Sequence, residues 1–241
     1  MSPLKRIREG GVEVLRLDRP ERRNAMNTAL LTEILAALDE LRNDPEAKAV
    51  VFSTTNERAL CAGADVSEEL DAAGGVARME LFTRMYSAVE AFPLPTVAVC
   101  VGNVVGAGAE LAAGCDLRVG GDNLKLAWAG AKLGVPVGPA RLVPLVGLSR
   151  AKELILTGRA VGQEEAARIG LLHHATPAAE AEAKAIELAQ QIAQYPTDGL
   201  KRLKTMFREL EDSARRAAYE NELLLDFQRA GAGLPKGGMK G

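Results

Sequence analysis

Several residue types that mark particular classes of protein are scarce in this sequence of 241 residues. Aromatic residues make up 4% of it, so the core must be built from alanine, leucine and valine. Cys61, Cys100 and Cys115 stand apart without a CxxC pair. This spacing excludes a disulfide framework and a cysteine zinc site, and it favours a reducing, cytoplasmic setting.

Basic residues are not in excess, and long apolar runs are missing. The net charge of −2 argues against nucleic acid as the main partner. No stretch is long and apolar enough to cross a membrane, and the opening MSPLKRIREGG lacks the apolar centre of a signal peptide. The two histidines are adjacent, His173 and His174, and on a strand they would point to opposite faces. We therefore expect no metal site, no nucleic acid and no membrane as partner.

Strand-like and helical patterns alternate through the first two thirds of the chain. The predicted strands cover 11–20, 47–54, 95–101, 115–120 and 124–128, and the predicted helices cover 28–43, 76–92 and a segment that begins near Gly106 or Ala107. After residue 149 the pattern is helical, and the glycine-rich end 231–241 is expected to be mobile. This order predicts an α/β fold with a helical C-terminal region.

Two turns could present free backbone N–H groups to a ligand. In ALCAGADVSEEL (59–70), small residues at 62–64 allow close approach of the backbone. In GNVVGAG (102–108), a turn follows a strand and leads into a helix. Such N–H groups can hold an oxyanion. Taken alone, the first turn is better explained as a tight connection in which Asp65 caps a helix, because cap and turn chemistry is so common.

Glu110 is the only charged side chain between Ala91 and Cys115. Nothing near it in the sequence can pair with it, and an unpaired buried carboxylate is costly. A first-turn glutamate favoured by the helix dipole is the alternative. Two sets of amide donors and one isolated acid together indicate a reaction through an enolate-like anion, in which the donors stabilise oxygen charge and the acid moves a proton.

Four segments carry a resemblance to a known family. They are RPERRNAMN (19–27), LCAGADVSE (60–68), GNVVGAGAELAAGCDLRV (102–119) and GLSRAKELILTGRAVGQEEAARIGLLHHATP (147–177). In this order and spacing, from about residue 10 to about residue 230, the chain resembles the enoyl-CoA hydratase/isomerase (crotonase) family.

The resemblance implies a fold, an assembly and a substrate. It implies a crotonase-like ββα spiral that binds acyl-CoA over residues 1–190, and a C-terminal helical oligomerisation region with a flexible tail over 191–241. The expected assembly is a homotrimer or a hexamer made of two trimers. The expected partner is an acyl-CoA or enoyl-CoA thioester, with no cofactor other than the coenzyme A of the substrate.

Matching positions transfer roles to individual residues. The backbone N–H groups of Ala64 and Ala107 would form the oxyanion hole, and Glu110 matches the first catalytic glutamate of the hydratases. The residues expected to contact coenzyme A or the acyl group are Arg23, Ala25, Arg58, Ala62, Asp65 and Val66. For either arginine taken singly, a solvated surface position is the better interpretation.

The chain departs from the family where the hydratases carry a second glutamate. Ala129 and Gly130 occupy the positions of the usual Pro-Glu pair, so the second acid is absent. Arg141 corresponds to the arginine of the segment that follows. Glu68, Glu69 and Asp122 could replace the acid, but surface positions are expected for all three. Trp128 is expected to fill the core rather than to wall the acyl pocket.

Three functions follow from this departure. Hydration of a trans-2-enoyl-CoA is the preferred one, with Glu110 as the single acid–base group. Isomerisation needs only one acid to carry a proton between two carbons, although family isomerases often keep it nearer the position of Gly130. The third alternative is a non-catalytic acyl-CoA-binding protein, which Gly130 favours and an isolated acid at Glu110 opposes.

Overall fold

The strands of the molecule form two sheets. The computed structural model describes residues 2–231 and 234. A six-stranded sheet has the order β1-β2-β3-β5-β7-β9, and a three-stranded sheet has the order β4-β6-β8. β1 and β2 are antiparallel, and every other pair of neighbours is parallel. The strands are β1 Leu4–Glu9, β2 Val12–Leu17, β3 Ala49–Thr54, β4 Ala59–Cys61, β5 Thr96–Cys100, β6 Asn103–Val105, β7 Leu117–Gly121, β8 Lys125–Ala127 and β9 His174–Thr176.

One structural unit recurs along the chain. It consists of a strand in the large sheet, a strand in the small sheet and then a helix. The unit occurs as β3-β4-α2, as β5-β6-α3 and as β7-β8-α4. The chain therefore advances as a spiral of ββα turns, and the turn from the small sheet into each helix falls at the same end of the structure.

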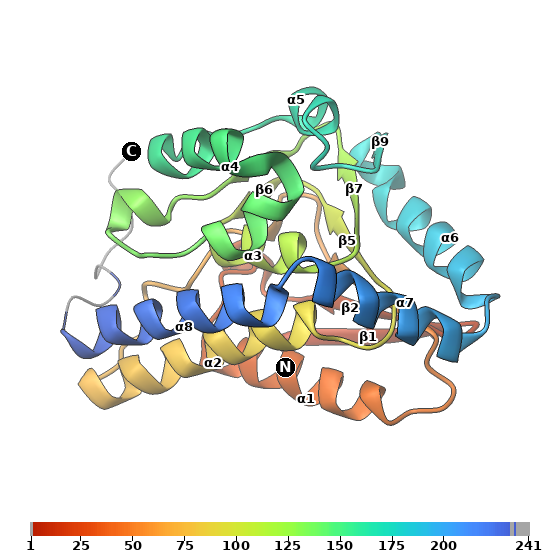
Figure 1. Ribbon diagram of the computed structural model, residues 1–241, viewed down its shortest axis with the longest axis horizontal. Helices are drawn as coiled ribbons and strands as arrows, with labels where there is room; N and C mark the ends of the chain where they lie inside the picture. The colour runs from red at the N-terminus through yellow and green to blue at the C-terminus, as the bar shows by residue number, and fades with distance from the viewer. Residues whose placement is uncertain (1, 232–233, 235–241) are drawn as a thin grey trace.

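The helices cover both faces of the large sheet (Figure 1). They are α1 Thr28–Arg42, α2 Ala72–Glu90, α3 Ala107–Gly114, α4 Pro139–Thr157, α5 Gln163–Arg168, α6 Ala181–Ala193, α7 Thr197–Leu210 and α8 Ser213–Arg229, with short 3₁₀ turns at Pro20–Arg22, Gly130–Leu133 and Ala178–Glu180. α6 packs against β2, β3, β5 and β7 on one face, and α1, α2 and α3 belong to the core on the other. α8 returns to lie along α2 (Figure 1).

The central strands are buried on both faces, which explains why they have near-continuous apolar runs. In β3, Val50 and Phe52 belong to the core under α1 and α2, whereas Ala49 and Val51 belong to the core under α6. The parallel strands thereby form a central layer of the core, and the turns described below follow β4 and β6 of the small sheet.

The α/β prediction with a helical C-terminal region is confirmed. The predicted helix 76–92 begins earlier, at Ala72, because the Asp71 carboxylate caps it by accepting a hydrogen bond from the Gly74 N–H at 2.7 Å. None of the described helices is long and apolar enough to cross a membrane. The predicted mobile tail lies outside the described residues except for Gly231 and Leu234, and the division at residue 190 stays a prediction.

Candidate functional site

A cavity of about 200 Å³ lies where the two predicted donor turns meet. Its lining is almost entirely apolar, and among the described residues no charged side chain contributes to it. The lining residues are Ala62, Gly63, Ala64, Val66, Met79, Phe82, Tyr86, Val105, Gly106, Ala107, Ala129, Gly130, Leu133, Val135, Val137, Leu224 and Leu234. Both predicted oxyanion residues, Ala64 and Ala107, therefore face one space.

The two turns approach each other through glycines. Gly63 and Gly106 immediately precede Ala64 and Ala107, and both are left-handed, with φ of 111° and 53°. A Cβ built on Gly63 would lie 3.4 Å from the Val105 carbonyl oxygen, and one built on Gly106 would lie 3.9 Å from the Gly63 Cα. Both distances are ordinary van der Waals contacts, so it is the positive φ at each position that favours glycine.

The chain around Met26 holds the first turn and leaves the Ala64 amide free. The Met26 N–H donates to the Gly63 carbonyl, and the Asp65 N–H donates to the Met26 carbonyl, each at 2.8 Å. These bonds form a parallel bridge between Met26 and Ala64. Within the described part of the chain, the Ala64 N–H has no hydrogen-bond acceptor, so it is available to a ligand in the cavity.

The second amide belongs to the first residue of a helix. Ala107 begins α3, where N–H groups have no partner inside the helix. The Gly106 N–H is already bound to the Ala127 carbonyl at 3.0 Å, whereas the Ala107 N–H donates to no acceptor among residues 2–231 and 234. The helix dipole adds positive potential at this end. Two amides from separate turns are thus left to a ligand oxygen.

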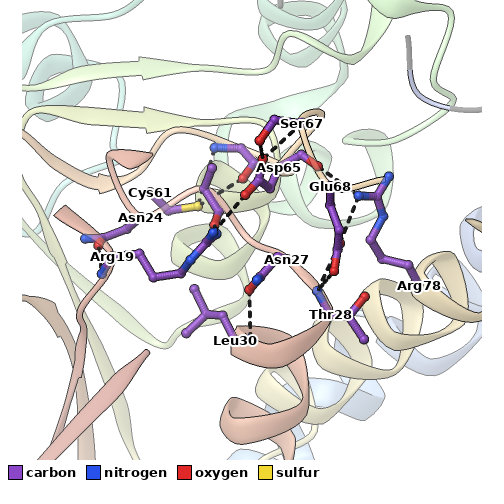
Figure 2. Close-up of polar contacts among 12 residues, drawn as sticks. Arg19, Asn24, Asn27, Thr28, Leu30, Cys61, Asp65, Ser67, Glu68 and Arg78 are labelled. Carbon is purple, nitrogen blue, oxygen red and sulfur yellow. Dashed lines mark hydrogen bonds and ion pairs between the residues drawn. The ribbon is translucent and has the colours of Figure 1, made fainter. Parts of the chain in front are cut away.

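Asp65 stabilises the first turn from behind (Figure 2). One of its oxygens accepts from the Ser67 N–H at 3.0 Å and the Ser67 hydroxyl at 2.6 Å, and the other accepts from Arg19 at 2.9 Å. Burial alone would raise the pKa of Asp65, but these hydrogen bonds outweigh it and hold the pKa below its ordinary value. Asp65 does not line the cavity. The capping alternative is also wrong, because α2 begins at Ala72 and is capped by Asp71, whereas Asp65 closes the turn through Ser67.

Glu68 was expected on the surface, and that expectation is wrong. Its carboxylate accepts from the Thr28 N–H at 3.1 Å and from Arg78 at 3.1 Å, so it joins the start of α1 to α2 (Figure 2). Asn27, one residue earlier, caps the same helix through the Leu30 N–H. The segment after the first turn is therefore fixed by side chains from two helices. Glu69 and Asp122 are exposed, as expected.

Glu110 is completely buried, but it is not unpaired, and this part of the sequence interpretation is wrong. One of its oxygens accepts from the Trp128 indole N–H at 2.7 Å, and the other accepts from the Nε of Arg141. Trp128 fills the core, as expected, and it also contacts the acid. Glu110 is not among the cavity-lining residues, so its carboxylate lies behind the wall of the cavity.

Arg141 joins Glu110 to two other carboxylates. Its side chain is 1% exposed, forms an ion pair with Glu220 of α8 and lies 3.6 Å from Glu90 of α2. Its guanidinium also lies over the Tyr86 ring, 4.9 Å from the centroid. Burial raises the pKa of Glu220 to about 7, and the charge of Glu110 adds to this effect. Sequence reasoning matched Arg141 to the family but missed its partners.

The position of the missing second acid has no space for a side chain. Gly130 lines the cavity, but a Cβ placed on it would lie 2.8 Å from the Val135 carbonyl oxygen and 3.0 Å from the Val137 side chain. Real Cβ atoms essentially never come as close as 2.8 Å. The segment that follows the small sheet is therefore folded tightly around a glycine, and no other described carboxylate takes its place in the cavity.

The remaining predicted binding residues are divided between the cavity and the surface. Ala62 and Val66 line the cavity, and Ala25 is half-buried. Arg23 and Arg58 are exposed, so their contact with a coenzyme A phosphate stays a prediction.

No group of three potential metal ligands exists among the described residues. His173 accepts a hydrogen bond from the Arg118 N–H at 3.1 Å, and burial lowers its pKa.

Comparison with protein families and with curated proteins gives a consistent result. A family model described as enoyl-CoA hydratase/isomerase matches residues 7–230. A putative enoyl-CoA hydratase of Thermus thermophilus is 35% identical over 227 residues, which cover 89% of this chain and 89% of that protein. A probable mitochondrial enoyl-CoA hydratase 2 of Arabidopsis thaliana is 36% identical over 189 residues, which cover 76% of this chain and 63% of that protein.

Solved structures match the fold. An enoyl-CoA hydratase from Bacillus anthracis aligns with a TM-score of 0.83 at 27% identity, covering 93% of this chain and 91% of that one. An enoyl-CoA hydratase/isomerase from Xanthobacter autotrophicus aligns with a TM-score of 0.87 at 24% identity, covering 98% and 90% of the two chains. The likeness at 24% identity concerns the fold alone, and it agrees with the ββα spiral predicted from the sequence.

Proposed function

We propose that this chain, which belongs to the enoyl-CoA hydratase/isomerase family, binds an acyl-CoA thioester and hydrates trans-2-enoyl-CoA. One observation carries the proposal: the free N–H groups of Ala64 and Ala107 belong to residues that line one apolar cavity. A thioester carbonyl oxygen placed between them gains negative charge as an enolate forms. Fixed donors in an apolar site stabilise that charge strongly.

In the proposed reaction one carboxylate carries the proton. Glu110 removes a proton from water while the water oxygen bonds to C3 of the enoyl group. The C2–C3 double-bond electrons move onto the thioester carbonyl, and the two amides hold the resulting enolate oxygen. Glu110 then returns the proton to C2, so the product gains one water and the enzyme is unchanged. Because Glu110 does not line the cavity, the reaction requires a movement that brings its carboxylate to the substrate.

A non-catalytic acyl-CoA-binding protein is the second candidate. The position of Glu110 favours it, because both of its oxygens already accept hydrogen bonds and neither side chain that donates them lines the cavity. The steric block at Gly130 also favours it, because this chain lacks space for the second acid. This candidate keeps the two amides as the binding site for the thioester oxygen and assigns Glu110 a structural role.

The two candidates differ in turnover, which the conjugated thioester absorbance of a short trans-2-enoyl-CoA reports directly. We expect the wild-type protein to consume the conjugated thioester, and Glu110→Gln to lower kcat by about 100- to 10,000-fold. Glu80→Gln, an exposed glutamate of α2, is the matched control and should keep wild-type activity.

Calorimetry with a saturated acyl-CoA separates the remaining outcomes. Binding without turnover, equal in wild type and Glu110→Gln, would support the non-catalytic candidate. Absence of both binding and turnover would refute both candidates. A 3-enoyl-CoA, assayed by the gain of conjugated absorbance, tests isomerisation in the same samples.

A further inference from the structure

A buried cluster of charged groups joins the C-terminal helix to Glu110, and the proposed reaction does not explain it. Glu220 of α8 has a side chain that is 6% exposed and forms an ion pair with Arg141. Its second oxygen accepts hydrogen bonds from the Gly138 N–H at 3.1 Å and the Ala140 N–H at 2.8 Å. Glu220 therefore fixes both the guanidinium of Arg141 and the start of the helix that carries it.

Arg141 is shared between two acids. Its Nε donates to Glu110 and one terminal nitrogen donates to Glu220, so the two carboxylates compete for one positive charge. Its other terminal nitrogen has no hydrogen-bond partner among the described residues, and neither has the Glu90 oxygen that lies 3.6 Å away. The guanidinium thus forms hydrogen bonds with Glu110 and Glu220 but not with Glu90. It can therefore move toward one of the two bound carboxylates and away from the other.

The charges of the cluster do not cancel when every acid is ionised. The titratable and charged groups around Glu220 come from four helices. They are Arg141 of α4, Glu110 of α3, Glu90 and Tyr86 of α2, and Arg216 of α8 itself. Three acids thus face two arginines, and Arg216 lies 3.8 Å from Glu90 and 3.4 Å from the more exposed Glu211. A proton on one of the buried acids relieves the excess of negative charge.

We propose that Glu220 is a positioning residue: its own proton sets how strongly Arg141 holds the Glu110 carboxylate. With Glu220 protonated, the charge of Arg141 is directed to Glu110 and holds it firmly. When Glu220 ionises, it draws Arg141 toward α8, and Arg141 holds the Glu110 carboxylate less tightly. The catalytic consequence rests on the proposed function, whereas the coupling between the two acids does not.

The single tryptophan of the chain reports the state of Glu110 without any substrate. Trp128 donates its indole N–H to the Glu110 carboxylate, so one ¹H–¹⁵N indole resonance records that hydrogen bond. We expect this resonance to titrate in the wild-type protein with a midpoint near the pKa of about 7 of Glu220. We expect the pH dependence to disappear in Glu220→Gln. Glu222→Gln, an exposed neighbour on α8, should titrate as the wild type does.

Activity measured over the same pH range tests the catalytic consequence. In the wild type, kcat/KM for the short enoyl-CoA should rise by about tenfold as Glu220 ionises, because a carboxylate held less tightly by Arg141 accepts a proton from water more readily. Glu220→Gln should match the wild type within about twofold at low pH and lack the rise. Glu220→Asp, which keeps an acid, should retain a titration with a displaced midpoint.

The outcomes separate the two proposals. An indole resonance that does not titrate in the wild type would overturn the positioning role, and this result does not depend on how well any variant folds. A resonance that titrates identically in a folded Glu220→Gln variant would also overturn it. A titrating resonance that depends on Glu220, in a protein without turnover, would support the coupling and refute the hydratase. A titrating resonance with a flat wild-type pH profile would overturn the catalytic part.

Discussion

At the scale of single residues, the proposed chemistry depends on backbone atoms more than on side chains. Ala64 and Ala107 offer only a methyl group, so another small residue can replace either one as long as its N–H keeps its direction. Glycine in place of Ala107 would preserve the donor. The positive φ of Gly63 and Gly106 sets the backbone conformation directly before both residues, and both residues line the cavity.

Proline at position 107 tests the donor with little cost to the fold. Ala107 is the first residue of α3, where proline is favoured, and its N–H makes no hydrogen bond among the described residues. We expect Ala107→Pro to lower kcat by about 100- to 1,000-fold, the usual effect of losing one oxyanion donor. The measurement is hydration of the short enoyl-CoA, with circular dichroism to verify the helix.

The control for this substitution is Ala107→Gly, which keeps the amide. It should stay within about tenfold of the wild type, because only helix propensity and one methyl group are lost. Equal losses in the two variants would show that the methyl group or local order matters, and the assignment of the Ala107 N–H as a donor would be incorrect.

At the scale of elements, the first donor turn is held by contacts from outside its own ββα unit. The turn follows β4, yet Asp65 pairs with Arg19 from the segment after β2, and Glu68 binds the start of α1 (Figure 2). Asn24 adds to this by donating to the Thr54 hydroxyl at 2.7 Å. The polar residues Arg19 and Asn24 of the motif RPERRNAMN thus stabilise the neighbouring turn and the strand before it by hydrogen bonds.

Asp65→Asn is expected to weaken the contact between the first donor turn and Arg19. The variant loses a charged partner of Arg19, which should lower the free energy of unfolding by about 1–3 kcal/mol at pH 7. Because the folded protein holds the pKa of Asp65 below its ordinary value, this contribution is present above the unfolded pKa of about 3.9 and is lost as pH falls through the folded pKa. Urea unfolding should therefore show wild type and variant converging in acid.

Asp39→Asn, the same substitution at an exposed position of α1, is the control for this series. It should match the wild type at pH 7. A difference between Asp65→Asn and the wild type that stays constant down to the acid limit would mean that charge is not what Asp65 contributes.

At the scale of the whole molecule, the sequence predicts local patterns well and distant pairings poorly. The donor turns, the buried strands and the resemblance to the family can all be read from short segments. The Glu110–Arg141 pair joins residues 31 positions apart, and Arg141–Glu220 joins residues 79 positions apart. No local pattern signals either pair, because each depends on how α4 and α8 return to α3. Glu110 therefore has no partner close to it in the sequence, although Trp128 and Arg141 contact it in the fold.

Assembly is the remaining expectation at this scale, and α7 provides a way to test it. Leu203, Met206, Phe207 and Leu210 of this helix are 48%, 59%, 58% and 82% exposed. An exposed apolar face of this kind is typical of an interface. We predict that the protein is a trimer or a dimer of trimers, and that Leu210→Glu lowers its mass in light scattering toward that of one chain, because a buried charge in the interface is unfavourable.

Leu156→Glu is a closely matched control, since Leu156 is 73% exposed on α4 and receives the same substitution. It should leave the mass unchanged if the interface is formed by α7. Glu220 also lies on a C-terminal helix, so the Trp128 indole resonance can be recorded on the dissociated protein. A changed resonance would show that assembly affects the acid cluster, and an unchanged resonance would show that it does not. A wild-type protein with the mass of one chain would contradict the prediction, and the exposed face of α7 would then need another explanation.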